Sequence, residues 1–320
     1  MPKVILLAGG GGHTAYAYAL AQHLSGKCEI ESIVPEGDTL SRLRLEKLGS
    51  VRTLIKPRGP KTSFSRFAWG MMLSFLHSYS VIGSSRDIVV STGSNFCIAP
   101  CLYAKIRGNP IVNIESSVRF VKASKTVKIL SYIARLNALQ WDEQKKLIQK
   151  GEVVGPMLAN REVQPYDGGY ILVTGGTHGH KALFECLSKS GLENVVLQAG
   201  PLYSEFLTKN PKWKVIDYTD RFHELLAGAQ VVVTHFGETS LDAALVYCKP
   251  IVISVNPEWT RTAGMEDASI LAKKLNAVLL DEFTPKSLID AIERAKQMSR
   301  PVYNNGAEVL SNKILEMLEE

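Results

Sequence analysis

One arrangement occurs twice in this chain, at residues 3–20 and again at 170–187: a short apolar run, a group of glycines, and a helical pattern of small and apolar residues. Apolar runs this short are typical of strands that are buried on both faces. Glycines directly after such a strand allow the backbone to turn closely into the next helix. The alternation of buried strands with helices predicts an α/β protein with two Rossmann-like, doubly wound parallel sheets. Further runs of the same kind occupy residues 29–35, 86–93, 110–116, 194–200, 214–219, 230–235 and 250–255.

The chain has 320 residues, which is more than one hydrophobic core usually organises. A stretch with two prolines and three glycines, residues 153–169, separates the two series of strands and is expected to be a linker. We therefore expect domains over 1–156 and 165–302, with an amphipathic last helix near 305–320 that crosses back to the first domain. Because open parallel sheets bind ligands beyond the carboxyl ends of their strands, both glycine loops are expected to line a cleft between the domains.

Basic residues outnumber acidic ones only slightly, by 37 to 31, which gives a net charge of +6. This excess favours an anionic partner, such as a phosphate-bearing ligand or an acidic membrane surface. The sequence has no long basic run, aromatic RNA-binding signature or zinc-finger spacing, so a nucleic-acid partner is not expected. It also has no signal peptide and no apolar run of the roughly 18 residues that a membrane span needs. The protein is expected to be soluble or only peripherally attached to a membrane.

The five cysteines (Cys28, Cys97, Cys101, Cys186 and Cys248) include no Cys-x-x-Cys pair, and most have apolar neighbours. They are expected to be reduced thiols in the core of a cytosolic protein. Cys97 and Cys101 are spaced to share one helical face, but the sequence offers no further ligands for a metal beside them. No metal site is expected.

The first glycine loop, residues 9–12, has the features of an anion site. Free N–H groups and the dipole at the start of a helix favour a phosphate, and a purely structural tight turn is the alternative. Gly10, Gly12 and Ala15 also fit the relaxed dinucleotide fingerprint GxGxxA, which keeps a nicotinamide-dependent dehydrogenase open. His13 follows this loop directly. Because the dipole disfavours its cationic form, His13 is expected to act as a general base near pH 7, the alternative being a capping or core histidine.

Two further groups of polar residues follow predicted strands. Glu115 comes after the apolar run that begins at residue 110, where it is expected to orient His13, to stabilise its charge or to accept the proton itself, unless it only caps a helix. The stretch 234–253 is the densest polar cluster, and it suits the phosphates and ribose of a nucleotide, a well-capped helix being the alternative. Its polar residues and its glycine are His235, Gly237, Glu238, Thr239, Ser240 and Asp242.

Residues 61–82 combine many large apolar side chains with Lys61 and Arg66. The segment is too short and too interrupted to span a bilayer, and two interpretations remain open. It lies in a membrane interface with its basic residues at the headgroups, or it is a buried helix of the first domain. In the first case, the residues expected to contact the membrane are Phe64, Phe67, Trp69 and Met72.

Four motifs resemble one family, the inverting GT-B glycosyltransferases typified by bacterial MurG and by the two-subunit eukaryotic enzyme that adds the second N-acetylglucosamine to dolichyl-diphosphate-linked N-acetylglucosamine. "GGGGHTA" is similar to the family's acceptor-side Gly-Gly-His loop, and residues 89–116 are similar to its glycine-rich loop, small-residue helix, strand and glutamate. "VTGGTHG" resembles the phosphate loop "VTGGSQG", and residues 231–253 resemble the donor motif "HxGxxSxxEAxxxGKPxxxxP". Both halves stand in one chain with the acceptor-type half first, as in archaeal fused versions.

The resemblance implies a GT-B fold and transfer of N-acetylglucosamine from UDP-GlcNAc, with neither a metal nor a cofactor required. It implies an acceptor of the polyprenyl-diphosphate-sugar class, namely dolichyl-diphosphate-GlcNAc, used for protein N-glycosylation at the cytoplasmic face of the cell membrane. His13 and Glu115 take the catalytic positions, and Gly11, Gly12 and Thr14 take the positions that bind the acceptor diphosphate. The implied donor-binding residues are Gly175, Gly176, Thr177, His178, Phe222, His235, Gly237, Glu238, Thr239, Ser240 and Asp242.

The chain departs from the family pattern in three places. The glutamate that holds the ribose is replaced by Ala243, so Asp242, Glu238 or neither takes its role. Residues 258–269 replace a glutamine-containing stretch, and the hydrophobic N-terminal anchor of the eukaryotic acceptor-side subunit is not found, which moves membrane contact to 61–82. A UDP-sugar 2-epimerase of similar architecture and a non-catalytic nucleotide-sugar-binding subunit stay open as alternatives.

Overall fold

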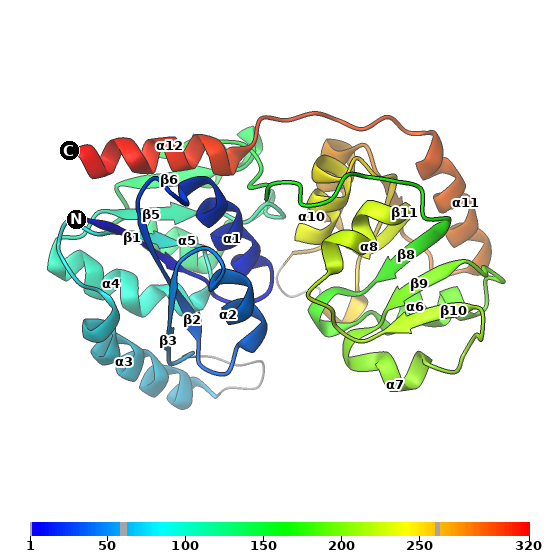
Figure 1. Ribbon diagram of the computed structural model, residues 1–320, viewed down its shortest axis with the longest axis horizontal. Helices are drawn as coiled ribbons and strands as arrows, with labels where there is room; N and C mark the ends of the chain where they lie inside the picture. Colours follow the sequence, from blue (N-terminus) through cyan, green and yellow to red (C-terminus); the bar gives the residue numbers. More distant parts are fainter. Residues whose placement is uncertain (1, 58–62, 260–262) are drawn as a thin grey trace. The chain divides into compact units, whose positions relative to one another are not determined.

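The computed structural model describes residues 2–57, 63–259 and 263–320. The chain divides into two compact units, which are shown in Figure 1. The first comprises Met1–Ala159 together with Asn304–Glu320, and the second comprises Asn160–Tyr303. The C-terminal segment thus belongs to the same unit as the N-terminus.

The first unit contains a sheet of seven parallel strands. They are β1 (Lys3–Leu7), β2 (Glu29–Pro35), β3 (Ser50–Leu54), β4 (Ile88–Ser91), β5 (Ile111–Ile114), β6 (Leu136–Leu139) and β7 (Gly151–Val153). Their order in the sheet is β3-β2-β1-β4-β5-β6-β7. The chain reverses its direction across the sheet between β1 and β4, which is where open sheets of this class bind ligands.

Helices cover both faces of this sheet. On one face, α1 (Gly12–Leu24) and α12 (Gly306–Glu319) share a core with alternate residues of β1, and Leu310 is fully buried in it. On the other face, α3 (Phe64–Val81), α4 (Ile98–Arg107) and α5 (Lys125–Leu130) pack around Ile5 and Leu7. The remaining helix, α2 (Thr39–Leu45), is capped by the carboxylate of Asp38, which accepts from Ser41 N. Helices on both faces explain why the central strands are apolar throughout.

The second unit repeats this plan with six parallel strands. They are β8 (Tyr170–Thr174), β9 (Val195–Gln198), β10 (Trp213–Ile216), β11 (Ala229–His235), β12 (Ile251–Ser254) and β13 (Val278–Leu280), in the order β10-β9-β8-β11-β12-β13. The chain changes direction across the sheet between β8 and β11. Its helices are α6 (Lys181–Ser188), α7 (Tyr203–Phe206), α8 (Phe222–Gly228), α9 (Glu238–Leu241), α10 (Met265–Leu275) and α11 (Pro285–Gln297). The prediction of two Rossmann-like, doubly wound parallel sheets is confirmed.

Candidate active site

In the first unit, three loops meet at the carboxyl edge of the sheet, where β1, β4 and β5 end. The loop after β1 turns through Gly10 (φ 88°) and Gly11 (φ 57°), which are backbone angles that residues with a side chain rarely adopt. A side chain at Gly9 would overlap Ser94, because its Cβ would lie 2.2 Å from the Cβ of Ser94. The glycines therefore let the loop after β1 lie directly against the loop after β4.

The same loop leaves backbone donors available for an anion. None of the residues that the structure describes accepts a hydrogen bond from the N–H of Gly11, Gly12 or His13. These residues stand at the start of α1, so the helix dipole adds to the attraction. Thr14 is different, since its N–H donates to the Gly11 carbonyl (3.0 Å) and its hydroxyl is paired with the hydroxyl of Ser41 (2.7 Å). Thr14 is buried, and its polar atoms are engaged within the protein.

His13 has one ring nitrogen fixed by the protein. Its Nδ1 lies 2.6 Å from the carbonyl oxygen of Thr92, which can only accept, so Nδ1 carries the proton and Nε2 presents a lone pair. Burial lowers the pKa of His13 below its usual value, and the cations Lys56 and Arg119 lower it further, while the Thr92 carbonyl acts in the opposite direction. The imidazole is therefore neutral at pH 7 and has the tautomer of a general base.

Glu115 stands directly after β5 and is fully buried. Its Oε1 accepts from the N–H of Ser116 (2.7 Å) and its Oε2 from the N–H of Ser124 (3.0 Å). The Ser124 hydroxyl in turn donates to the carbonyl of Gly93 (3.3 Å), a glycine that lies against the ring of His13. Burial raises the pKa of Glu115 to about 7, against the two backbone hydrogen bonds and the cation Arg119, which favour the charged form. The carboxyl group of Glu115 therefore stabilises the conformation of the loop after β5, close to His13.

In the second unit, the loop after β8 is packed against the loop after β11. Gly176 has φ 66°, and a Cβ there would lie 2.3 Å from Cε1 of His235. The N–H of Gly176 donates to the hydroxyl of Thr174 (3.1 Å). Only glycine fits at this position, because any side chain would collide with the imidazole.

Two side chains from other strands hold the rest of this loop. Tyr218 donates its hydroxyl proton to the carbonyl of Thr177 (2.9 Å), and Asn256 Nδ2 donates to the carbonyl of Gly179 (3.0 Å). The N–H of Thr177 has no acceptor among the residues that the structure describes. Gly175 is closely packed as well, since a Cβ on it would lie 2.4 Å from the backbone N of His180. The loop is a rigid backbone cradle with an available donor.

Histidines surround this second loop. Burial lowers the pKa of His235 to about 4, with a smaller contribution from His178, which is exposed. Burial also lowers the pKa of His180 to about 4, with a contribution from His235. In the described part of the chain, Nδ1 of His235 and Nε2 of His180 are buried without a hydrogen-bond partner. The two buried imidazoles are therefore neutral at pH 7. The predicted donor residue Phe222 is the first residue of α8 and is half-buried.

The helix after β11 places Glu238 and Asp242 on one face. Both are half-buried, and they stand four residues apart, whereas Ala243 is fully buried in the core. Gly237 and Thr239 are half-buried too, and the hydroxyl of Ser240 donates to the carbonyl of Gly237 (2.6 Å). Beyond Asp242 the helix widens into a π turn over Asp242–Val246, a form that is frequent at functional sites. Asp242 and Glu238, but not Ala243, can reach a ligand.

The segment 61–82 forms a helix that is buried on one face and exposed on the other, so it is not the fully buried helix that one interpretation of the sequence expected. α3 packs against α4 through buried Ser74 and Ser78, and Phe75 stacks edge-on against Tyr103 (5.6 Å between ring centroids). Its opposite face is exposed and apolar, with Trp69 60% and Tyr79 69% exposed. Met72 and Leu76 are exposed on the same face. Phe67 is half-buried, while Lys61 and the side chain of Phe64 lie outside the described residues. No helix among the described residues is long and apolar enough to cross a membrane.

The expectation that the cysteines are core thiols is wrong for Cys248 and only partly right for Cys28. Cys97, Cys101 and Cys186 are buried, but Cys28 is half-buried and Cys248 is exposed. Cys248 follows the π turn and has φ 53°, so it leaves the helix in a conformation that turns it outward. No group of three or more potential metal ligands occurs among the described residues.

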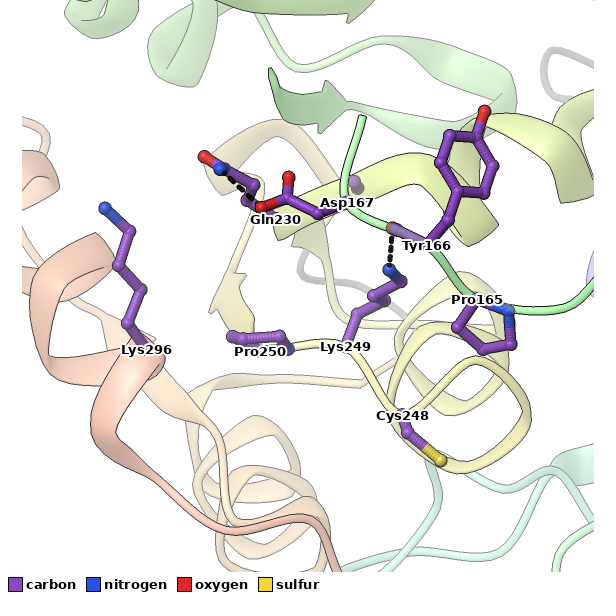
Figure 2. Close-up of a pocket in the computed structure, with 9 residues that line it drawn as sticks. Pro165, Tyr166, Asp167, Gln230, Cys248, Lys249, Pro250 and Lys296 are labelled. Carbon is purple, nitrogen blue, oxygen red and sulfur yellow. Dashed lines mark hydrogen bonds between the residues drawn. The ribbon is translucent and has the colours of Figure 1, made fainter. Parts of the chain in front are cut away.

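A hollow of about 630 Å³ lies at the other end of the second sheet. Figure 2 shows it where β11 and β12 begin, with Lys249 Nζ donating to the carbonyl of Tyr166 (2.8 Å) and Gln230 paired with Asp167 (3.1 Å). The glycine loops stand at the carboxyl ends of the strands. The hollow is therefore no part of the candidate active site.

Three features of the site were not predicted from the sequence. The Thr92 carbonyl fixes the tautomer of His13, and Lys56 and Arg119 act on its charge. His180 caps α6 by accepting from Leu183 N (3.3 Å). A charge count gives a partial signal for the two cations: between residues 47 and 141 there are fourteen Lys and Arg residues but only two acids, both buried.

Comparisons with known proteins agree with this architecture. Residues 4–157 match the family "Oligosaccharide biosynthesis protein Alg14 like", and residues 170–319 match "Glycosyltransferase family 28 C-terminal domain". A UDP-N-acetylglucosamine--N-acetylmuramyl-(pentapeptide) pyrophosphoryl-undecaprenol N-acetylglucosamine transferase of Salinibacter ruber is 25% identical over 88% of this chain and 84% of its own length. The protein of the same name from Flavobacterium psychrophilum is 22% identical over 99% of this chain and 98% of its own length.

Solved structures show the same fold. MurG from Acinetobacter baumannii covers 100% of this chain and 99% of its own, with a TM-score of 0.65 at 15% identity. The UDP-GlcNAc 2-epimerase from Methanocaldococcus jannaschii covers 98% of this chain and 99% of its own, with a TM-score of 0.66 at 13% identity. At these identities the likeness concerns the fold alone. Taken with the two family matches, these results place the chain among GT-B glycosyltransferases of the MurG and Alg14 type.

Proposed function

We propose that this protein transfers N-acetylglucosamine from UDP-GlcNAc to a sugar carried on a polyprenyl diphosphate, with inversion at the anomeric carbon. One observation carries the proposal: a neutral histidine with its Nε2 lone pair available stands directly beside three backbone amides without an acceptor among the described residues. Such amides suit the diphosphate of the acceptor. The histidine suits the hydroxyl that must lose a proton.

In this proposal His13 is the general base. Its Nε2 accepts the proton of the acceptor hydroxyl while the oxygen attacks the anomeric carbon, and the bond from that carbon to UDP breaks on the opposite side. Glu115 is a positioning residue, because both of its oxygens accept from backbone N–H groups of the loop after β5. UDP leaves with its charge stabilised by loop amides and helix dipoles, so the mechanism requires no metal and no cofactor.

The donor is held by the second unit. Gly175, Gly176, Thr177 and His178 provide the diphosphate cradle, and His235 stacks beneath it. The burial of Ala243 supports Asp242 as the carboxylate that binds the ribose, with Glu238 on the same helical face. The other proposed contacts come from Phe222, Gly237, Thr239 and Ser240. His235 is neutral at pH 7, so it acts on the phosphates through hydrogen bonding rather than charge.

The identity of the acceptor is the finer part of the proposal. The relatives' printed name gives an N-acetylmuramyl-(pentapeptide) pyrophosphoryl-undecaprenol acceptor. The Alg14-like match over residues 4–157 supports instead an acceptor used in oligosaccharide biosynthesis. We keep dolichyl-diphosphate-GlcNAc, and with it a role in lipid-linked oligosaccharide assembly for protein N-glycosylation, as the first acceptor to test. In this proposal Gly11 and Gly12 bind its diphosphate through their amides. Thr14 stabilises the loop, because its N–H donates to the Gly11 carbonyl and its hydroxyl pairs with that of Ser41.

A lipid acceptor requires contact with a membrane, which we assign to the exposed face of α3 at the cytoplasmic side of the cell membrane. Trp69 and Met72 provide apolar area on this face, with Phe67 beside them in the sequence. The region from residue 47 to 141 adds cations and has no exposed acid among its described residues. Apolar side chains surrounded by positive charge favour peripheral binding to anionic lipids.

The alternatives receive less support. A UDP-sugar 2-epimerase acts on a soluble substrate and has no use for an exposed aromatic helix face or for acceptor amides in the first unit. A non-catalytic subunit would not need a histidine that is held in the tautomer of a general base, as His13 is. Neither of the two matching families is described as a nicotinamide-dependent dehydrogenase.

The test is a transfer assay on membrane lipids. Purified protein is incubated with a panel of labelled UDP-sugars and with either dolichyl-diphosphate-GlcNAc or the undecaprenyl-linked muramyl pentapeptide, and the lipids are analysed by mass spectrometry. We expect one N-acetylhexosamine to be added from UDP-GlcNAc to one of the two acceptors. Conversion of UDP-GlcNAc to its 2-epimer without any lipid product would replace this proposal with the epimerase.

A further inference from the structure

The loop after β5 is held by more buried polar side chains than a surface connection needs. Glu115 accepts from the N–H groups at both ends of it, at Ser116 and Ser124. Gln144 Nε2 donates to the carbonyl oxygens of Ser116 (2.7 Å) and Arg119 (2.9 Å). Gln144, like Glu115, is fully buried. The backbone of Arg119 is thereby fixed in the middle of a loop that ends beside His13.

The side chain of Arg119 is half-buried and forms no ion pair among the described residues, although it is close enough to His13 to lower its pKa. A second cation reaches the same place from another strand. Nζ of Lys56, which follows β3, would lie 3.7 Å from a Cβ on Gly10, and it acts on His13 as well. Lys56 also forms no ion pair among the described residues. Two cations from separate strands therefore flank the acceptor loop.

We propose that Arg119 and Lys56 clamp the diphosphate of the acceptor over the amides of Gly11–His13, and that the bound diphosphate makes His13 a stronger base. This inference rests on the proposed function for the identity of the ligand. A guanidinium and an ammonium that form no ion pair among the described residues suit two phosphate groups. The free amides supply the remaining donors.

The second half of the proposal follows from charge. In the free protein the two cations disfavour the imidazolium form of His13. A diphosphate carries at least two negative charges, so it offsets both cations and favours proton uptake by His13. Three other ionisable groups face this place. The carboxylate of Asp38 accepts from Ser41 and lies beside Gly10 near Lys56, Arg119 acts on the charge of Glu115, and the ring of Tyr16 packs edge-on against His13. The base becomes stronger only when the acceptor is in place.

Binding is tested first, because it does not depend on turnover. Inorganic pyrophosphate and farnesyl diphosphate are titrated calorimetrically into the full-length protein and into the variants Arg119→Gln and Lys56→Gln. We expect each substitution to weaken binding roughly tenfold to a hundredfold, the loss that follows from removing a charge-assisted hydrogen bond. Matched controls are Lys122→Gln in the same loop and Lys47→Gln before β3, both exposed, which should bind as the wild type does. Urea unfolding of all four variants should match that of the wild type, which shows that the first unit is folded, and UDP binding by the second unit should be unchanged.

The effect on His13 is then measured by NMR titration, with the His13→Gln variant used to assign the signal. The pKa of His13 should rise when pyrophosphate is added to the wild type, and it should be higher in Arg119→Gln than in the wild type without ligand. Two results would overturn the inference even if transfer occurs. One is equal pyrophosphate affinity in all variants, and the other is a pKa of His13 that does not change when pyrophosphate is added. If no lipid is glycosylated but pyrophosphate binding depends on Arg119 and Lys56, the clamp stands and the proposed function fails.

Discussion

In the first unit, the loop after β1 leaves the amides of Gly11, Gly12 and His13 without an acceptor among the described residues, whereas the loop after β8 in the second unit is hydrogen-bonded at most of its positions. Both loops follow the first strand of their sheet and both contain glycines with positive φ. The difference lies in what fills the space beside them. In the first unit a histidine presents a lone pair, and in the second unit a neutral histidine packs beneath the backbone. The same fold thus provides a reacting base in one unit and a rigid cradle in the other.

The largest effect is expected from removing His13, the proposed base beside the loop after β1. In His13→Gln we expect kcat for glycosyl transfer to fall by about a hundredfold to ten-thousandfold, the usual contribution of a general base. UDP affinity should stay as in the wild type, because the donor loop belongs to the second unit. The matched substitution His178→Gln, on the exposed histidine of the second loop, should affect donor KM more than kcat. Equal losses of kcat in both variants would remove the distinction between the loops.

Glu115 allows the first loop to be probed through stability. Its pKa is about 7 in the folded protein and 4.5 in an unfolded chain, so between these values the carboxyl group binds more protons in the folded state, and its contribution to the free energy of unfolding falls as pH rises. His180 and His235 contribute with the opposite sign, so the test compares two variants that both keep these histidines. Over this range the loss amounts to about 3 kcal/mol at 1.36 kcal/mol per pH unit. Glu115→Gln does not titrate, so the free energy of unfolding of the wild type relative to this variant should fall by this amount as pH rises.

Urea unfolding of the wild type and Glu115→Gln from pH 4.5 to 8 measures the difference. Glu29→Gln is the control, since Glu29 is exposed at the start of β2 in the same unit. The wild type and this control should show the same pH dependence. A difference between the wild type and Glu115→Gln that stays constant with pH would mean that Glu115 ionises in the folded state as easily as in the unfolded chain.

The second loop is tested by adding one methyl group. Gly176→Ala places a Cβ 2.3 Å from His235 and also strains a positive φ, so UDP affinity should fall at least about tenfold. Gly191→Ala shares the strain at φ 75° but has nothing within 4 Å of its Cβ. It should cost about 1–2 kcal/mol of stability and leave UDP affinity unchanged. Equal UDP affinity in the two variants would show that the cradle is not where UDP binds.

The smallest expected effect is on membrane binding through the exposed apolar face of α3, a helix of the first unit. Trp69→Ser combined with Tyr79→Ser should reduce binding to anionic vesicles by roughly tenfold, because each exposed ring contributes apolar area to the interface. The free energy of unfolding should change by less than about 0.5 kcal/mol, since both side chains are exposed. Leu207→Ser, on an exposed apolar residue of the second unit, should leave vesicle binding as it is. Vesicle binding that survives the double substitution would move the membrane contact elsewhere.

The sequence predicted the central strands of both sheets because they are buried on both faces and read as unbroken apolar runs. It did not predict β3, β6, β7 or β13. β3 is mostly exposed, Asn137 interrupts the apolar residues of β6, and β7 and β13 have only three residues each, so none has an apolar run as long as those of the central strands. Their pairing is imposed by the neighbouring strand.

The site was predictable only where its residues are neighbours in the sequence. His13 follows its glycine loop directly, so a local pattern is enough to find it. Arg119 and Lys56 stand more than 40 residues from His13, and only the parallel order of β3, β1 and β5 brings them to one edge. Cys248 was misjudged for a related reason, because Val246 and Tyr247 before it are buried, whereas Cys248 itself has a positive φ and is exposed.

In the proposed mechanism a single displacement, with His13 as base, joins the acceptor to the sugar of UDP-GlcNAc. The most direct test is the configuration of the new linkage, read from the anomeric proton coupling in the NMR spectrum of the purified lipid product. UDP-GlcNAc carries its sugar in the α configuration, so a single displacement gives a β linkage, which shows the large coupling of two axial protons. An α linkage would contradict it, because retention requires either two displacements or an attack from the side of the leaving group.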